Sequence, residues 1–181
     1  MRMNDEDSKK NLIFDVILKW VVDIILVVVF ALFIINYYGE SAVVSGNSMN
    51  PIVENEEMVL LDQLSYELKE PKRFDVIAYV SRSGDVSIKR IIGLPGETVQ
   101  IIDNTIYIDG EEIEDKYFDG KFESGYVDEA IVIGDNEYFV MGDNRNVSED
   151  SRFEYVGNIS KDDILGKIWF VCYPFNKLRM L

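Results

Sequence analysis

The stretch VQIIDNTIYIDGEEI, residues 99–113, alternates apolar and polar side chains around two turn signals. The pairs Asp103-Asn104 and Asp109-Gly110 are residue types that readily enter the left-handed backbone of tight turns. Alternation with a period of two is typical of a half-buried strand, because successive side chains of a strand point to opposite faces. The stretch therefore predicts a β-hairpin followed by a further strand.

Shorter runs of the same kind occupy most of residues 39–181. They are rich in β-branched and aromatic residues, which favour strands. These runs are FDVIAYV, DVSIKRIIG, EAIVIGDNEYFVMG and LGKIWFVCY. The predicted fold class is mainly β, with an antiparallel sheet or barrel-like domain over residues 39–181.

Two segments of this domain are expected to depart from the strand pattern. A single short helix is expected around residues 160–165, where Ser160 would cap KDDIL. Residues 111–129, called here the acidic segment, carry eight acids against two lysines. We expect the acidic segment to be a solvated excursion between strands.

Residues 20–38, WVVDIILVVVFALFIINYY, predict one membrane-spanning helix. Such a helix is about 28 Å long, close to the roughly 30 Å thickness of bilayer hydrocarbon. Trp20, Tyr37 and Tyr38 suit the aromatic belts at the two interfaces. A buried core helix is the alternative. A cleaved signal peptide is disfavoured because the apolar run is longer than usual and GESAVV is a poor cleavage site.

The charges on either side of this span predict its orientation. Four basic residues precede it, and residues 39–68 contain neither Lys nor Arg; the four are Arg2, Lys9, Lys10 and Lys19. The positive-inside rule then places residues 1–19 in the cytoplasm and residues 39–181 outside the cell membrane. We therefore expect an uncleaved signal anchor that carries an extracytoplasmic domain.

The composition excludes several functions. The formal charge of −15 argues against nucleic acid as a partner, because phosphate contacts need clustered Lys and Arg. The 181 residues contain no histidine, so a Ser-His-Asp triad, a Cys-His dyad and a His-ligated zinc site are all impossible. The single Cys172 cannot form an internal disulfide, and we expect it to be a small buried hydrophobe.

The stretch SGNSMNP, residues 45–51, places Ser48 in a predicted turn. Gly46 allows the chain to turn tightly and Pro51 restricts it on the other side. A backbone N–H in such a turn can face an oxyanion. A serine hydroxyl is a poor nucleophile until a base removes its proton, so Ser48 needs a base from elsewhere. A plain loop is the alternative.

The stretch DVSIKRIIGLPGE, residues 85–97, offers Lys89 as that base. In a strand, Ser87, Lys89 and Ile91 share one face, so this lysine lies within a strongly apolar element. An exposed lysine has a pKa near 10.4 and is a useless base at neutral pH. Burial away from counter-charges lowers the pKa, because desolvation disfavours the ammonium form. The alternative is that Lys89 extends its amine to water.

A third stretch, MGDNRNVSEDSR at residues 141–152, follows an apolar strand. Ser148 could hold the lysine amine by a hydrogen bond, while Asp150 and Arg152 could pair and fix the loop. A calcium-binding loop that starts at Asn144 does not fit the pattern, because its sixth position is Glu149 instead of Gly and its twelfth is Tyr155 instead of Glu. The alternative is an Asx-type turn with solvated charges.

In this order, after an anchor, the segments SGNSMNP, RFDVIAYV, KRIIGLPGE, GDNRNVSEDSR and LGKIWF resemble the type I signal peptidases over essentially the whole chain. The resemblance implies a Ser-Lys dyad, with Ser48 as nucleophile and Lys89 as general base. It implies that Ser148 orients the lysine amine and that Asp150 and Arg152 form a structural pair. Asp143 and Arg145 belong to the same motif without an assigned step.

The resemblance also implies how a substrate binds. An exported preprotein would dock as an added strand and be cut after a small-x-small sequence through an acyl-enzyme. Val44, Met49 and Ile88 would line a shallow apolar pocket for the residue before the cut. Gly46 replaces a serine that supplies a second oxyanion donor in some members, and Ile52 replaces a common threonine. No metal or organic cofactor is implied, and a monomer in the bilayer is expected.

Two other functions are weighed against this one. The self-cleaving Ser-Lys repressors of the SOS response share the chemistry, but they would carry a DNA-binding domain where this chain has an anchor. A catalytically inactive, membrane-anchored β scaffold that binds peptides would not need the intact Ser48, Lys89 and Ser148.

Overall fold

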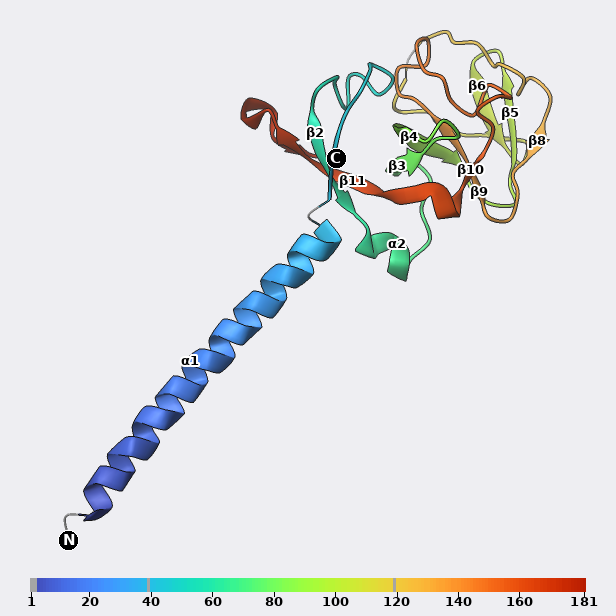
Figure 1. Cartoon of the computed structure of the whole chain (residues 1–181). Coiled ribbons are helices and arrows are strands. Elements are labelled where there is room, and N and C mark those ends of the chain that lie inside the picture. Colours follow the sequence, from blue (N-terminus) through green and yellow to red (C-terminus); the bar gives the residue numbers. More distant parts are fainter. Residues whose placement is uncertain (1–2, 39, 119) are drawn as a thin grey trace. The chain divides into compact units, whose positions relative to one another are not determined.

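The computed structural model describes residues 3–38, 40–118 and 120–181, which divide into two compact units (Figure 1). The first unit is the helix α1, Met3–Tyr38. Within it, Phe14–Ile34 is long and apolar enough to cross a membrane, with a mean hydropathy of 2.8 and none of its residues buried. The helix thus contains the predicted span and continues on its N-terminal side. The second unit begins at Glu40.

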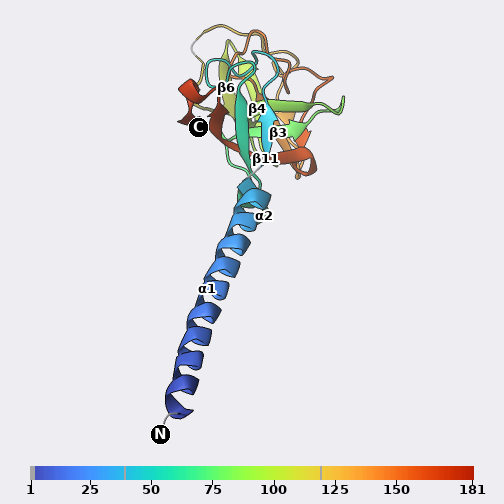
Figure 2. The ribbon, with the colours of Figure 1, turned by 60° about the vertical axis from the view of Figure 1, so that its left-hand side comes forward.

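The second unit is built mainly from antiparallel strands, as the sequence predicts (Figures 1 and 2). Its larger sheet has the order β1-β2-β11-β3-β4-β9-β10, with β12 paired to β11. The strands are β1 (Ser41–Val43), β2 (Met58–Asp62), β3 (Val76–Val80), β4 (Val86–Gly93), β9 (Glu137–Met141), β10 (Ile159–Ser160), β11 (Ile164–Tyr173) and β12 (Arg179–Met180). Strand β4 lies inside this sheet, between β3 and β9.

The smaller sheet has the order β7-β6-β5-β8 and contains the predicted hairpin. Its strands are β5 (Thr98–Ile102), β6 (Thr105–Ile108), β7 (Glu111–Glu112) and β8 (Ile131–Val132). Asp103 and Asn104 turn between β5 and β6 with φ of 49° and 69°, and Asp109 and Gly110 precede β7 with φ of 53° and 82°. Both predicted turns are therefore confirmed.

The predicted helix at residues 160–165 is wrong in extent. Only Lys161–Asp163 is helical, as the single 3-10 turn η1, because β11 already begins at Ile164. Ser160 does cap this turn, and its hydroxyl accepts a 3.3 Å hydrogen bond from the Asp162 amide. Two further short elements were not predicted, α2 (Leu64–Leu68) and η2 (Phe175–Lys177).

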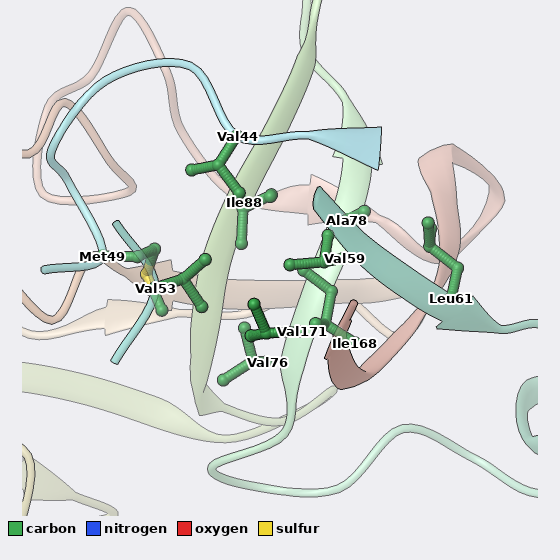
Figure 3. Close-up of a cluster of buried hydrophobic side chains, with 10 residues drawn as sticks. All are labelled: Val44, Met49, Val53, Val59, Leu61, Val76, Ala78, Ile88, Ile168 and Val171. Carbon is green, nitrogen blue, oxygen red and sulfur yellow. The ribbon is translucent and has the colours of Figure 1, made fainter. Parts of the chain in front are cut away.

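Three apolar clusters stabilise the domain. The first joins β2, β3, β4 and β11 to the chain after β1 and includes Val44, Met49 and Ile88 (Figure 3). The second joins the smaller sheet to β9 and includes Phe122 and Val127. The third packs β3, β4 and β9 together on the other face of β4. The β-branched and aromatic residues of the predicted strands thus form much of the core.

The acidic segment, which the sequence predicts to be a solvated excursion between strands, is in part buried. Phe122 and Val127 are buried in the second cluster, and Ile113 and Phe118 pack against it. Most of its described acids are exposed, Asp115 being half-buried, while the apolar residues among them cover the smaller sheet and the nearby loop. Cys172 also departs from expectation, since it is only half-buried.

Candidate active site

Strand β4 places Lys89 in an apolar environment. Lys89 lies opposite Ile77 in the β3–β4 register, and its side chain is only 6% exposed. Burial lowers the pKa of the Lys89 amine, while the carboxylates of Asp150 and Glu149 act in the opposite direction. Throughout residues 40–118 and 120–181 no carboxylate lies within ion-pair distance of this amine. The lysine is thus buried with no carboxylate of the described chain close enough to form an ion pair with it.

Ser48 lies in the turn after β1 and meets this amine. The Lys89 Nζ is 2.9 Å from the Ser48 Oγ, so the structure brings together two residues that are 41 positions apart. When Lys89 is neutral, its nitrogen has a lone pair that can accept the hydroxyl proton at this distance. The predicted serine–lysine pair is therefore present as a geometric pair.

Backbone contacts fix the turn that carries Ser48. The Asn144 amide donates a 2.9 Å hydrogen bond to the Ser48 carbonyl, and the Asn144 side chain donates a 3.1 Å bond to the Asn47 carbonyl. Gly46 has a φ of +94°, a conformation that side chains rarely adopt. Its N–H donates to the Asn55 Oδ1 at 2.8 Å. The loop at residues 142–144 thus holds the nucleophile candidate in place.

The predicted hydrogen bond between Ser148 and Lys89 is not formed. Ser148 is buried, and its hydroxyl has no hydrogen-bond partner among the residues that the structure describes. The hydroxyl lies instead against Gly142: a Cβ built on Gly142 would be 2.2 Å from the Ser148 Oγ and 2.5 Å from the Ser48 carbonyl oxygen. The backbone of Gly142 therefore fills the space between the two serines.

The expected pair of Asp150 and Arg152 is formed. The Arg152 guanidinium donates to both carboxylate oxygens, at 2.8 and 2.9 Å, and both side chains are buried. The second oxygen of Asp150 also accepts a 3.0 Å bond from the Gly142 amide. This carboxylate links the arginine to the glycine between the serines.

A second buried ion pair was not predicted from the sequence. Arg90 donates two hydrogen bonds to the Asp143 carboxylate, at 2.7 and 2.6 Å, and a third to the Phe74 carbonyl at 2.7 Å. Its guanidinium lies 3.6 Å from the ring centroid of Tyr117. Alternation along β4 was the available signal, since it places Arg90 on the face opposite Lys89.

The three residues expected to line a substrate pocket belong to one apolar cluster. Val44, Met49 and Ile88 are 5%, 1% and 7% exposed, and Figure 3 shows Val44 beside Ile88. Their side chains come from the chain after β1, the Ser48 turn and β4. Methyl and thioether groups therefore pack together next to the turn that carries Ser48.

Half of one edge of β4 is open beside this cluster. Strand β9 pairs with β4 only from Arg90 to Gly93. The N–H and C=O of Ile91 bond toward β3, so those of Ile88 point to the opposite edge. In the described part of the chain no strand pairs with that edge before Arg90. An extended peptide could therefore hydrogen-bond there.

An apolar helix followed by an antiparallel β domain with a lysine amine at a serine hydroxyl is the arrangement of a membrane-anchored serine hydrolase. A family model described as signal peptidase, peptidase S26, matches residues 17–173. Signal peptidase I S of Bacillus subtilis (strain 168) is 38% identical, over 99% of this chain and 98% of that protein. Signal peptidase I of Bacillus licheniformis is 36% identical, over 98% of each.

A crystal structure of a signal peptidase I from Enterococcus faecalis V583 is 35% identical, with a TM-score of 0.47, and the match covers 55% of this chain and 97% of that one. The family match and the curated relatives show that this chain belongs to the signal peptidase family, peptidase S26. Membership does not favour a self-cleaving repressor or an inactive scaffold.

Proposed function

We propose that Ser48 and Lys89 are the catalytic dyad of this chain, which as a family member is a serine endopeptidase that removes signal peptides. The observation that carries the proposal is the 2.9 Å contact between the Lys89 Nζ and the Ser48 Oγ. Neutral Lys89 takes the hydroxyl proton as Ser48 attacks the scissile carbonyl carbon. The lysine then gives that proton to the leaving amine, and water hydrolyses the acyl-enzyme.

Stabilisation of the oxyanion is assigned to the backbone N–H of Ser48. Within the described residues this N–H donates to no protein acceptor, which leaves it available for a negatively charged oxygen. Gly46 supplies no hydroxyl, and its φ of +94° would strain a serine at this position. The site is therefore proposed to work with one backbone donor.

The substrate is proposed to be an extended preprotein segment with a small residue before the cut. The open edge of β4 supplies hydrogen-bonding groups at Ile88 for an added strand. The buried apolar cluster of Val44, Met49 and Ile88 supports a preference for a methyl-sized side chain before the cut, because a larger one would overlap with these residues. Together these features favour cleavage after small-x-small sequences.

The orientation in the membrane is proposed from charge. Basic residues gather before the span, so residues 1–19 are assigned to the cytoplasm and residues 39–181 to the extracytoplasmic side. We expect the chain to act as a monomer in the bilayer, with residues 39–181 as the catalytic domain. Protease treatment of sealed cells tests this topology, because digestion of an intracellular domain would require disruption of the membrane.

The experiment that tests the dyad is cleavage of a precursor with an Ala-x-Ala site by the full, detergent-purified chain. The matched variants are Ser48→Ala and Lys89→Ala. A single cut after the second alanine by the parent chain, with no product from either variant, supports the dyad and the substrate class together. Equal cleavage by all three proteins would overturn the assignment of both residues.

A further inference from the structure

The acidic segment holds a buried arginine next to the candidate active site. Arg145 is 2% exposed and forms an ion pair with Asp115. Its guanidinium carbon lies 5.6 Å and 5.3 Å from the ring centroids of Phe118 and Phe122. In the described chain neither terminal nitrogen of Arg145 has an aligned hydrogen bond, so Asp115 is the group that compensates its charge.

Arg145 in turn holds Gly142, the residue between the two serines. The Arg145 Nε donates a 2.9 Å hydrogen bond to the Gly142 carbonyl, while the Gly142 amide is bound by Asp150. There is no room for a side chain at Gly142, because an added Cβ would be 2.5 Å from the Ser48 carbonyl oxygen and 2.2 Å from the Ser148 hydroxyl oxygen. Gly142 therefore lies against both serines, and a shift of its backbone changes the packing around them.

A second arginine of the same loop is bound by the same segment. Arg152 donates a 3.0 Å hydrogen bond to the Glu123 carbonyl, and its own carbonyl accepts a 3.1 Å bond from the Tyr126 amide. Gly125, with a φ of +67°, lies so close that a Cβ would be 2.0 Å from the Arg152 carbonyl oxygen. The acidic segment thus contacts both arginines that brace the loop at residues 142–152.

We propose that the acidic segment positions the loop at residues 142–152 and that Asp115 is its principal positioning residue. The inference rests on the proposed roles of Ser48 and Lys89. Asp115 touches neither of them and acts through Arg145 and Gly142. Loss of its charge leaves the Arg145 cation buried and uncompensated, so Arg145 must shift, and Gly142 shifts with it. Displacements of about 1 Å at a catalytic group cost on the order of 100-fold in rate.

Asp115→Asn, Asp115→Glu and the control Glu114→Gln test this proposal in the full, detergent-purified chain. Glu114 is adjacent, but its side chain is 78% exposed and, among the residues that the structure describes, it pairs with exposed Lys116 alone. The readouts are kcat and KM for an Ala-x-Ala precursor, labelling of Ser48 by a peptide boronate, and thermal unfolding. Asp115→Asn should lower kcat and labelling by roughly 10- to 100-fold at unchanged KM. Asp115→Glu should recover part of kcat, and Glu114→Gln should match the parent chain.

A double variant separates positioning from stability alone. Asp115→Asn with Arg145→Met leaves no buried charge unpaired and should regain thermal stability, but it lacks the bond to Gly142 and should keep the low kcat. Recovery of kcat together with stability, or an unchanged kcat in folded Asp115→Asn, would overturn the inference. Failure of the dyad itself has a different signature, namely cleavage by Ser48→Ala.

Discussion

Strand β4 carries two adjacent buried cations, one on each face, which differ in their partners. Lys89 and Arg90 are consecutive and almost equally buried, at 6% and 4% exposure. Arg90 has a two-point contact with Asp143, a backbone carbonyl and a tyrosine ring. The lysine has only the hydroxyl of Ser48 within hydrogen-bond distance, judged over the described residues. Burial is thus the same for both, and the partners differ.

This difference in partners distinguishes a cation that holds the structure in place from one that can act as a base. A buried cation with a carboxylate and satisfied donors keeps its charge and its geometry. A buried ammonium without such partners is destabilised relative to the neutral amine, and this lowers its pKa toward the range where it can act as a base. Arg90 on one face holds the loop that carries Asp143, and Lys89 on the other face contacts Ser48, the nucleophile candidate.

The strongest test of the comparison removes the unpaired cation. Lys89→Met keeps the length of the side chain but cannot accept a proton, so kcat for precursor cleavage should fall by at least about three orders of magnitude. The same variant should be at least as stable as the parent chain at neutral pH, because methionine buries no charge. Cleavage assays and thermal unfolding in detergent measure both quantities.

The stability effect of Lys89→Met should depend on pH. The folded-state pKa of Lys89 is lowered, so the lysine's contribution to stability is fully present above its unfolded pKa near 10.4. That contribution is lost as the pH falls through the lowered folded pKa. The methionine variant should therefore gain stability relative to the parent chain as the pH falls. A variant that is inactive because it is unfolded at neutral pH would contradict the comparison.

Removal of the paired cation, Arg90, should instead lower the stability of the chain. Arg90→Met leaves the Asp143 carboxylate buried and uncompensated, and loss of one partner of such a pair costs about 3–5 kcal/mol of unfolding free energy. Chemical unfolding measures this loss. Arg90→Lys should be intermediate, because lysine restores the charge but not the two-point contact. An Arg90→Met chain as stable as the parent would show that the pair is dispensable.

The sequence predicted the strands and turns because their signals are local. Alternation and Asp-Asn or Asp-Gly pairs specify the hairpin at residues 99–113 without long-range information. The sequence offered Lys89 as a base for Ser48 because it lies in an apolar strand, but the family resemblance was needed to join residues 41 positions apart. Arg90 with Asp143 and Arg145 with Asp115 were missed, because a charged residue's partner depends on tertiary packing. The burial of Phe122 within the acidic segment was not predicted, because the acids around it dominate the local pattern.

The pH dependence of cleavage is a smaller effect and sharpens the comparison. Neutral Lys89 is the base, so kcat/KM should rise up to about tenfold per pH unit and level off above the Lys89 pKa, which burial places below the usual lysine value. The exposed Glu149 raises that pKa, so Glu149→Gln should move the profile to lower pH. Exposed Glu154, which does not act on Lys89, is the control as Glu154→Gln. A profile that Glu149→Gln moves to higher pH would be inconsistent with Lys89 as the titrating group.

The smallest effect is expected from a cation that is paired but exposed. Lys177 lies 2.6 Å from Glu54, with the two side chains 41% and 47% exposed. Solvent screens such a pair, so Lys177→Met should change the unfolding free energy by less than about 1 kcal/mol and leave precursor cleavage unchanged. Chemical unfolding beside Arg90→Met gives the comparison directly. Equal losses of unfolding free energy in the two variants would show that pairing alone determines the contribution of a cation to stability. A large loss in Arg90→Met and almost none in Lys177→Met would show that burial of the pair determines it.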